Sequence, residues 1–553
     1  MSTVAKPYLD EKTAEETRVE DLLREAEKGT EIEHNMTLWE GLRKYPKACF
    51  WSMMISVAVI MEGYDVVLLG NFYAYPAFKR QFGEPTTDKN GNPDWQVPAR
   101  WQAGLGNASG VCSIIGVLLN GILAERFGYR RTMFWTLIWM TGVIFLMFFC
   151  KSLGMLLAAQ FLAGFAWGIF QTLTTTYAAE VAPLPLRGIL TTWVNACWGI
   201  GQLIAVGLLR GMVNRTDEWA WRIPYAIQWF WPIPLIITAI FAPESPWWLV
   251  RKGKVEEARK SLRRLYSGND EEEIQSTLAM MEHTIAMERA TTAGATYLEL
   301  FKGVNLRRTE IVCGAWAVQQ LCGSSFMGYC TYFLQQAGFS VENSFSMTMG
   351  QYAINTGGTF IAWGLMGMGI GRRAIYLYGC IWMACVLLII GGVSLIGSKG
   401  SSWAVGVMLL VWSVAYQFTV GTVCYALVAE LPSRRLAIKS INIGRGFYNV
   451  IGIVNGSYMA YMLNPTAWNW GGKTAFYWAG MCSLCCVWIY FRLPEPKGLT
   501  YQEINARFEA KVPARKFQSV DMNIFERTDE NIAAAHLAVE DDHKGKTEHV
   551  EKA

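Results

Sequence analysis

Two carboxylates, Glu62 and Asp65, stand inside the first long apolar segment of the chain. The segment begins near Phe50, so at about 1.5 Å per helical residue both lie roughly 18 to 23 Å into a hydrocarbon layer of ~30 Å. An ionised side chain at that depth normally faces a polar cavity, finds a partner or carries a proton. Spaced three apart, the two share a helix face. They predict proton coupling; the alternative is that they only form hydrogen bonds between packed helices.

A guanidinium group occupies a similar position in a later apolar segment. Arg445 lies about nine residues into that segment, where it needs an anionic partner or an aqueous path. We expect Arg445 to act on Glu62 and Asp65 through a shared cavity, so that proton release and substrate movement are linked.

The composition is that of a polytopic membrane protein. The chain has 553 residues, is 52% hydrophobic and contains 24 Trp and 52 Gly, which makes a soluble enzyme a poor interpretation. The net charge of +4 is small and no basic run is interleaved with aromatics, so no nucleic-acid partner is expected. No Gly-rich loop of the ATP-binding type is present. We expect no cofactor, with a proton gradient as the driving force.

Cysteine and histidine usage gives no sign of a metal site. The 13 cysteines lie in or beside apolar segments, which argues against a disulfide framework. Cys482 and Cys485 form a C-x-x-C pattern inside the last apolar segment and are interpreted as packing residues. The five histidines all fall in polar regions. Proton chemistry within the membrane is left to carboxylates.

The segments that position these residues predict an all-α polytopic membrane protein. Twelve segments are long enough to cross a bilayer as helices. They are 50–74, 101–124, 132–150, 153–178, 188–209, 223–242, 311–336, 345–367, 374–396, 403–429, 437–462 and 474–493.

Charge predicts the orientation of these spans. The chain does not begin with a short basic region followed at once by an apolar one, so no cleavable signal peptide is expected. Lys and Arg gather in alternate short loops, which places those loops and both termini in the cytosol. The expected organisation is a tail (1–49), a six-helix half (50–243), a cytosolic helical insert (244–310) with an amphipathic helix from Lys254 to Tyr266, a second six-helix half (311–493) and a largely disordered cytosolic tail (494–553).

Short motifs recur at corresponding places in the two halves. The loop Gly121 to Arg131 after the second span is echoed by Gly371-Arg372-Arg373 after the eighth. Glu180 to Arg187 after the fourth span is echoed by Glu430 to Arg434 after the tenth. Two echoes at matching positions indicate related halves.

These motifs, with the boxes Pro243 to Leu249, Gln319 to Gly323 and Pro494 to Gly498, resemble the sugar porter branch of the major facilitator superfamily. Within that branch, Glu62 to Asp65, Gly328 to Phe333 and Gly444 to Asn449 are similar to the fungal maltose and general α-glucoside permeases. The resemblance implies twelve transmembrane helices and uptake of an α-glucoside or other oligosaccharide with a proton, by alternating access at a site between the halves. It also implies a plasma-membrane protein that works as a monomer.

The resemblance also assigns roles to the loop boxes. Arg126, Arg130 and Arg131 would pair with Glu180 or Glu244, and Arg434 or Arg435 with Glu430, as a latch that breaks when the halves rock. The alternative is that these are ordinary topology charges. The expected cytosolic gate comprises Arg126, Arg130, Arg131, Glu180, Arg187, Glu244, Arg372, Arg373, Glu430 and Arg434.

Sugar recognition needs amides, hydroxyls and aromatic faces directed into a cavity. The double Gln at 319 and 320 is the sugar-contacting pair that the resemblance implies. A lone amide in a membrane helix is as often a contact between helices, so the other candidates stay open to that alternative. The candidates are Gln319, Gln320, Asn195, Gln202, Ser325, Tyr425, Tyr448 and Asn449.

One departure from the family pattern keeps other functions open. Similar α-glucoside symporters have a further Glu in the second span, where this chain reads Val111-Cys112-Ser113-Ile114. The alternatives are a sugar sensor with little transport and a proton-antiport exporter of a metabolite.

Two further motifs are local. Gly164-x-x-x-Gly168 lies in an apolar span and predicts close helix packing. Asn214-Arg215-Thr216 is a candidate glycosylation sequon on an outside loop.

Overall fold

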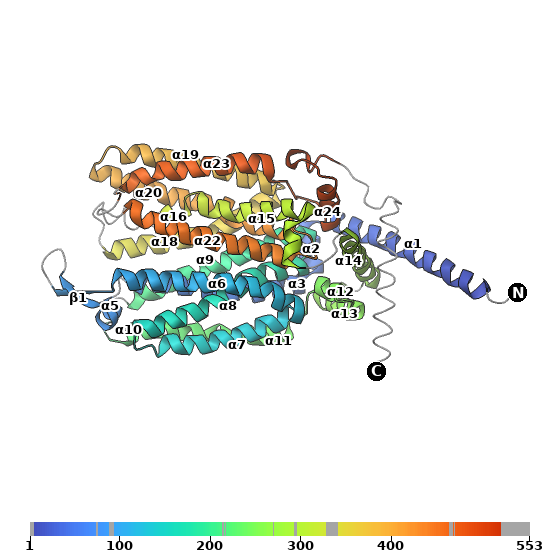
Figure 1. Cartoon of the computed structure of the whole chain (residues 1–553), viewed down its shortest axis with the longest axis horizontal. Helices are drawn as coiled ribbons and strands as arrows, with labels where there is room; N and C mark the ends of the chain where they lie inside the picture. Colours follow the sequence, from blue (N-terminus) through green and yellow to red (C-terminus); the bar gives the residue numbers. More distant parts are fainter. Residues whose placement is uncertain are drawn as a thin grey trace.

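The computed structural model describes residues 5–72, 76–87, 93–212, 215, 217–268, 270–291, 296–327, 341–463, 468 and 470–520. Long helices run side by side to form a bundle, with a group of further helices at one end and a small hairpin at the other (Figure 1). The end that carries the polar insert is called the insert end below. The hairpin, β1 (Glu84–Thr87) with β2 (Pro93–Gln96), is antiparallel and lies outside the bundle.

The N-terminal half is built from helices at the six predicted spans. They are α3 (Pro46–Ser56) with α4 (Ala58–Phe72), α6 (Ala99–Phe127), α7 (Tyr129–Phe148), α8 (Leu153–Val181), α9 (Leu184–Met212), and α10 (Trp219–Ile227) with η1 (Gln228–Phe230) and α11 (Pro232–Phe241). A short helix, α5 (Pro76–Phe82), precedes the hairpin. Proline at the first turn begins α3 and α11, where its missing N–H has no helical partner to lose.

The C-terminal half has helices at the other six predicted spans. They are α15 (Gly303–Leu321) with α16 (Ser324–Met327), α18 (Val341–Gly367), α19 (Arg372–Ser394), α20 (Lys399–Tyr416) with η3 (Gln417–Gly421) and α21 (Thr422–Glu430), α22 (Ala437–Leu463), and α23 (Thr474–Arg492) after η4 (Gly471–Lys473). The η3 segment is a π-helix within the tenth span. The motif at 328–333 lies outside the described residues.

Nine helical stretches of the described chain are long and apolar enough to cross a membrane. Large apolar side chains such as Trp135, Phe230, Ile233 and Leu484 are more than 60% exposed on them, as expected of surfaces that face lipid. The molecule is therefore a helical, multi-pass membrane protein. The helices at the seventh, eighth and eleventh predicted spans fall outside these nine, so the full count of twelve stays a prediction.

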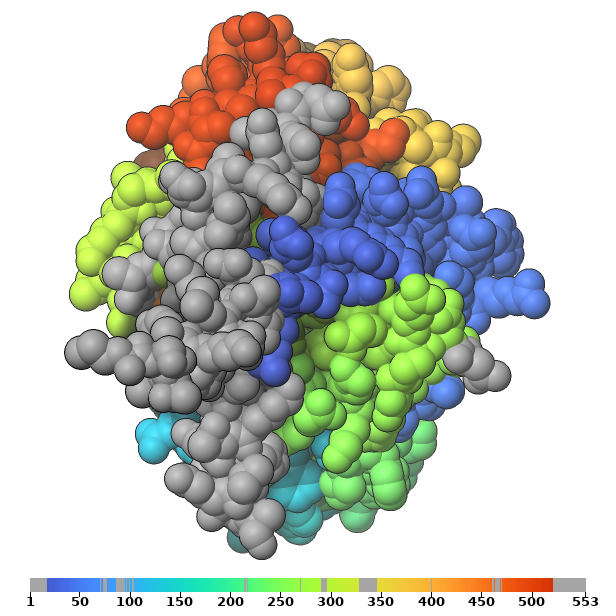
Figure 2. Space-filling model, turned by 90° about the vertical axis from the view of Figure 1, so that its right-hand side faces the viewer, coloured from blue at the N-terminus to red at the C-terminus, as the bar shows by residue number. Residues whose placement is uncertain are grey.

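The insert end gathers segments from the whole chain. It holds α1 (Ala5–Asn35), α2 (Leu38–Lys44), α12 (Pro246–Arg251), α13 (Val255–Leu265), α14 (Glu271–Thr291), η2 (Tyr297–Phe301), α24 (Tyr501–Glu509) and η5 (Ala514–Lys516). Seen from this end, the N-terminal helices lie directly against the insert (Figure 2). The predicted amphipathic helix is confirmed as α13. The expectation of disorder after residue 494 is wrong for α24, whose buried Tyr501, Ile504 and Phe508 anchor it to the bundle.

Close packing of α6 and α8 confirms the close helix packing predicted from Gly164-x-x-x-Gly168. A Cβ on Gly164 would lie 2.1 Å from the Ser109 carbonyl oxygen, and one on Gly168 would lie 2.3 Å from that of Ser113. Glycine is required there because the two backbones touch.

A thiol cluster joins α19 to α23 in the C-terminal half. The Sγ atoms of Cys380 and Cys482 are 3.4 Å apart, and Cys486 adds a third thiol beside them. Cys482 and Cys485 are both buried, consistent with packing roles.

Candidate functional site

The carboxyl of Glu62 lies inside the bundle rather than toward lipid. Glu62 on α4 is 5% exposed, and its Oε1 accepts a hydrogen bond from the side-chain amide of Gln171 on α8. The second oxygen, Oε2, is buried and has no hydrogen-bond partner among the described residues. Close contact of α4 with α9 holds this position, because a Cβ on Gly63 would lie 2.1 Å from the Trp198 carbonyl oxygen.

Gln171 links this carboxyl to the guanidinium of Arg445. The Nε of Arg445 donates to Gln171 Oε1 over 2.5 Å, while the amide nitrogen of Gln171 donates to Glu62. Arg445 lies on α22 in the C-terminal half, whereas Glu62 and Gln171 belong to the N-terminal half. Within the described part of the chain, Glu62 and Arg445 form no direct ion pair. One amide therefore connects an acid and a base across the two halves.

Asp65 contacts a separate set of side chains, all of them neutral. It is 1% exposed, and its Oδ1 accepts a hydrogen bond of 3.0 Å from Gln228 in η1. Gln160 and Trp167 of α8 face the same carboxyl. The structure thus places Arg445 beside the Glu62 network, while the groups around Asp65 all come from the N-terminal half.

Two of the predicted sugar contacts meet at the junction of η3 and α21. Gln319 is buried on α15 and donates to the Gly421 carbonyl over 2.8 Å. Asn195 on α9 donates to Thr422 Oγ1 over 3.1 Å. Their anchors are consecutive residues, so an amide from each half reaches the same point. The π-helix explains the first contact, because its irregular turn leaves carbonyl groups for side chains.

The predicted aromatic contacts gather beside Arg445. The ring of Trp316 lies 5.1 Å from that of Tyr425 and 5.6 Å from that of Tyr448. The Cζ atom of Arg445 lies 4.2 Å from the Tyr448 ring centroid and 4.6 Å from that of Trp316. Cation–π contacts of this kind keep a buried guanidinium in place without neutralising it.

The remaining predicted sugar contacts differ in how directly they touch the groups described above. Asn449 donates to Ser113 Oγ on α6 over 3.3 Å, which is another contact between the halves. Gln320 lies beside Gly452 and Tyr448. Gln202 on α9 is buried and Ser325 on α16 is half-buried; among the described residues neither bonds to the other candidates.

Sequence reasoning missed three residues of this region. Gln171, Thr422 and Trp316 lie at its centre. Gln171 carried a usable signal, since an amide in the apolar span 153–178 is as unusual as the carboxylate it serves.

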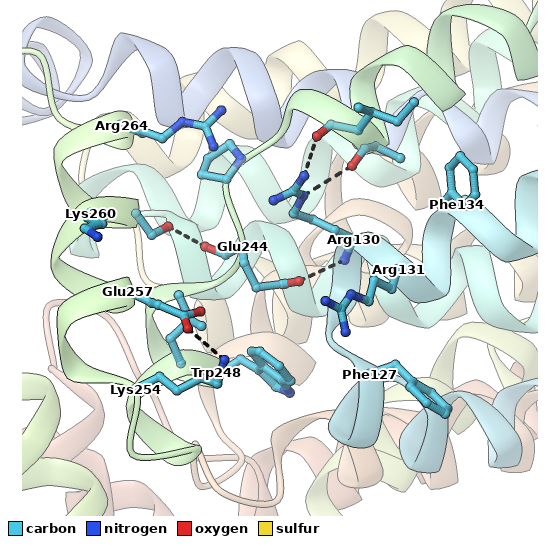
Figure 3. Close-up of a pocket in the computed structure, with 15 residues that line it drawn as sticks. Phe127, Arg130, Arg131, Phe134, Glu244, Trp248, Lys254, Glu257, Lys260 and Arg264 are labelled. Carbon is cyan, nitrogen blue, oxygen red and sulfur yellow. Dashed lines mark hydrogen bonds and ion pairs between the residues drawn. The ribbon is translucent and has the colours of Figure 1, made fainter. Parts of the chain in front are cut away.

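The predicted gate residue Glu244 caps a helix instead of pairing with an arginine side chain. Its carboxylate accepts the backbone N–H groups of Tyr129 (3.0 Å) and Arg130 (3.3 Å), at the start of α7. The Arg130 guanidinium instead donates to the carbonyls of Ala239 and Ile240 at the end of α11 (Figure 3). Burial raises the pKa of Glu244 to about 7, although the backbone N–H groups of Ser245, Arg130 and Tyr129 oppose that rise.

Two further carboxylates accept pairs of backbone N–H groups in the same way. Glu495 accepts the N–H groups of Arg372 (2.9 Å) and Arg373 (3.0 Å) at the start of α19. Glu288 of the insert accepts those of Arg434 (2.7 Å) and Arg435 (2.6 Å) before α22. Unpaired N–H groups and the positive end of the dipole make a helix start a favourable place for a carboxylate.

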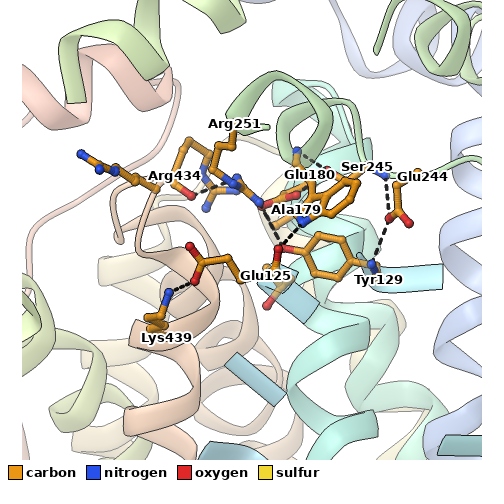
Figure 4. Close-up of polar contacts among 12 residues, drawn as sticks. Glu125, Tyr129, Ala179, Glu180, Glu244, Ser245, Arg251, Arg434 and Lys439 are labelled. Carbon is orange, nitrogen blue, oxygen red and sulfur yellow. Dashed lines mark hydrogen bonds and ion pairs between the residues drawn. The ribbon is translucent and has the colours of Figure 1, made fainter. Parts of the chain in front are cut away.

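The other predicted acids pair with arginines that differ from those expected. Glu180 forms a 2.9 Å ion pair with Arg251 of α12 and accepts from Tyr129 and Ser245 (Figure 4). Glu430 pairs with Arg372 over 3.2 Å.

The expected pairs of Arg126, Arg130 and Arg131 with Glu180 or Glu244, and of Arg434 with Glu430, are therefore wrong. Arg126 and Arg131 are exposed and form no ion pair within the described ranges. The carboxylates instead accept hydrogen bonds from backbone N–H groups at helix starts or form ion pairs with Arg251 and Arg372, which lie closer to them.

Arg187 and Arg434 share an aromatic partner that the sequence did not reveal. The Cζ atom of each lies 3.6 Å from the ring centroid of Tyr501 on α24. Arg187 also approaches Glu33 at 3.9 Å, and Tyr501 donates to the Ala179 carbonyl over 3.1 Å.

Direct contacts close the insert end between the two halves. Lys439 on α22 forms an ion pair with Glu125 on α6 (Figure 4). Arg251 of the insert donates to the Arg434 carbonyl over 3.0 Å. Tyr297 donates to the Leu118 carbonyl over 2.6 Å and lies beside Asn442. The glycosylation candidate Asn214 lies outside the described residues.

Comparisons with known proteins agree with this architecture. A family model described as "Sugar (and other) transporter" matches residues 51–508. The maltose permease MAL31 of Saccharomyces cerevisiae is 38% identical over 529 residues, which cover 95% of this chain and 85% of that protein. A general alpha-glucoside permease of the same organism is 40% identical over 508 residues, or 91% and 82% of the two chains.

A solved structure has the same fold. The proton:xylose symporter XylE bound to 6-bromo-6-deoxy-D-glucose, a member of the major facilitator superfamily, superimposes with a TM-score of 0.71 at 19% identity, over 84% of this chain and 100% of that chain. The family resemblance drawn from the sequence motifs is confirmed. On the extent of the family match and the identity to these permeases, the chain belongs to the sugar transporter family, and its fold is that of the solved major facilitator superfamily symporter.

Proposed function

We propose that this chain imports an α-glucoside or other oligosaccharide across the plasma membrane together with a proton, by alternating access. The names of the relatives, maltose permease and general alpha-glucoside permease, support the substrate class. The proton gradient is the driving force, and no cofactor takes part. Both termini and the insert lie in the cytosol, and the monomer is the working unit.

One observation carries the proton coupling: a single amide joins a buried acid in one half to a buried base in the other. When Glu62 is ionised, its charge attracts the amide N–H of Gln171 and, through the amide oxygen, the guanidinium of Arg445. A proton on Glu62 removes that charge and weakens the chain of hydrogen bonds. Protonation then changes how tightly α22 is held to α8, and a contact between the halves comes to depend on the proton.

Sugar is proposed to bind where amides from both halves converge. Asn195 and Gln319 reach adjacent residues at the start of α21, and the rings of Tyr425 and Tyr448 lie on the side toward Arg445. Sugar hydroxyls would replace the side-chain contacts of these amides, and the C–H face of a pyranose would pack on a ring. Because side chains from both halves would contact the sugar, a bound sugar favours closure of the two halves around it.

Asp65 is proposed as a second proton-binding group. Its neutral amide partners leave its charge uncompensated, so a proton on Asp65 removes the cost of burying that charge. The second predicted span, 101–124, carries no carboxylate, so Glu62 and Asp65 are the acids proposed for coupling.

Uptake measurements in a permease-free cell test the proposal. Labelled maltose, sucrose, trehalose, cellobiose and glucose are supplied in turn, and external pH is recorded. Import with a proton predicts accumulation of one or more glycosides with alkalinisation outside. Signalling without accumulation would support a sensor, and a lowered internal load would support an exporter; either result would refute the proposal.

A further inference from the structure

A basic cavity lies at the insert end, on the side of the bundle. Its volume is about 510 Å³, and it opens between the α6–α7 turn and the end of α11 on one side and helix α13 on the other (Figure 3). Its lining includes five basic residues. They are Arg130, Arg131, Lys254, Lys260 and Arg264.

The acidic residues of the cavity are already engaged. Glu244 accepts backbone N–H groups, and Glu257 forms a 2.8 Å ion pair with Lys254. Arg131 and Lys260 are exposed and have no ion pair among the described residues. Arg264 donates to the Phe241 carbonyl at the end of α11. The cavity therefore keeps an excess of positive charge with free donors.

The opposite rim of the cavity is apolar. Phe127 is 45% exposed and Ile240 is 47% exposed, and Phe134 lies beside them. The apolar surface continues along α11 with Ile237 and Phe241. Basic groups thus stand immediately beyond the lipid-facing surface of the bundle.

We propose that this cavity binds the headgroup of an anionic phospholipid. The phosphate lies between Arg131 on α7 and Lys260 and Arg264 on α13, and the acyl chains follow the apolar surface of Phe134 and Ile240. A free anion would use the cations alone and would leave that apolar rim without a purpose. Basic pockets at the cytosolic ends of membrane helices are suited to such headgroups, since each Lys or Arg adds attraction to an anionic leaflet.

A bound headgroup connects the N-terminal half to the insert. Arg131 stands in the first turn of α7, next to the N–H groups that Glu244 caps, while Lys260 and Arg264 belong to α13. A phosphate between them adds a link parallel to the Glu244 cap. Anionic lipid therefore stabilises the attachment of the insert.

The test compares two double variants of the full-length protein. Lys260→Gln with Arg264→Gln removes two cavity cations, and Arg259→Gln with Arg263→Gln removes the same charge from the part of α13 that pairs with Glu271. Each purified protein is titrated with phosphatidylserine or phosphatidylcholine, and bound lipid is counted by native mass spectrometry. Thermal unfolding in phosphatidylcholine alone checks that each variant is folded.

We expect the wild type and the control variant to retain phosphatidylserine in preference to phosphatidylcholine. The cavity variant should bind phosphatidylserine about 30-fold more weakly, the scale of two lost surface cations. Equal retention by both variants overturns the proposal. Displacement of the lipid by millimolar inorganic phosphate also overturns it, because the cavity would then recognise a free anion.

Discussion

The guanidinium carbon of Arg187 lies 3.6 Å from the ring centroid of Tyr501. Arg434, from the other half of the chain, lies at the same distance from that ring. Two like charges are therefore held near each other by a buried aromatic side chain from the C-terminal segment. Tyr501 is the point at which the two halves and the tail meet.

Tyr501→Ala should loosen the closed insert end. Each cation–π contact contributes about 0.5–2 kcal/mol, and the loss of both also leaves two guanidinium groups facing each other. Hydrogen–deuterium exchange should rise in α24 and at the start of α9. Tyr501→Phe is the matched control, because it keeps the ring and loses only the bond to the Ala179 carbonyl. An unchanged exchange pattern in Tyr501→Ala would contradict the role given to the ring.

Gln171→Met should uncouple the proton from sugar. Methionine fills a similar volume but breaks the hydrogen-bond chain from Glu62 to Arg445. Hydrogen bonds to charged groups contribute about 1.5–3 kcal/mol, so uptake driven by a pH gradient should fall about tenfold or more. Sugar exchange at equal concentrations on both sides should persist.

The matched control for Gln171 is Gln351→Met. It removes another buried amide, which bonds to Ser413 in the C-terminal half. Its pH profile should match that of the wild type. A Gln171→Met protein that accumulates sugar with the wild-type pH profile would exclude the coupling role.

Glu62→Gln and Asp65→Asn should both abolish accumulation driven by an imposed pH gradient. Each change keeps the shape of the side chain and removes the ability to carry a proton. Movement of sugar down its own concentration gradient should remain measurable in whole cells. Uptake by Asp65→Asn that still follows the pH gradient would leave Glu62 as the single coupling acid.

The contact of His34 with Glu503 should make the attachment of α1 to α24 depend on pH. The 2.9 Å hydrogen bond to Glu503 raises the pKa of His34 above its ordinary 6.5, although partial burial opposes this. The pKa of Glu503 is lowered: its burial acts in the opposite direction, but the hydrogen bonds from His34 and Thr500 prevail.

The sign of this pH dependence follows from the two shifts. The stabilisation that protonated His34 gives to this contact is fully present below its ordinary pKa of 6.5 and is lost as the pH rises through the raised pKa. The stabilisation that ionised Glu503 gives is lost only when the pH falls below the ordinary pKa of 4.5. Exchange protection of α1 should therefore fall as the pH rises above about 6.5, by at most ~1 kcal/mol for such a partly exposed pair. His34→Gln should remove that slope. A slope that survives the substitution would assign it to another group.

The sequence predicted the spans and the buried acids because both follow from the cost of polar groups in lipid. Glu62 and Asp65 are buried as expected, and Gln319 and Asn195 face the junction of the halves. The predicted arginine–carboxylate pairs of the cytosolic gate were wrong for a physical reason. A carboxylate such as Glu244 gains more from the free N–H groups at a helix start than from a flexible arginine, and sequence spacing does not show which helix starts are near.

Tertiary packing also hid the partners of Tyr501 and Gln171. Tyr501 lies more than 300 residues from Arg187, so no local pattern joins them. Gln171 stands out as an amide in an apolar span, but its partners Glu62 and Arg445 come from distant segments, so no local pattern shows what it binds.

The π-helix Gln417–Gly421 carries one residue more than a regular turn would hold. Removal of one residue from this segment would restore a regular helix and rotate everything before it by ~100° about the axis. Ser413, which now meets Asn355 and Gln351, would swing away from both, while Thr422 and Tyr425 stayed in register. The extra residue thus sets the rotation between the portions of the tenth span before and after it, and the length of this segment cannot be altered without losing one of the two interfaces.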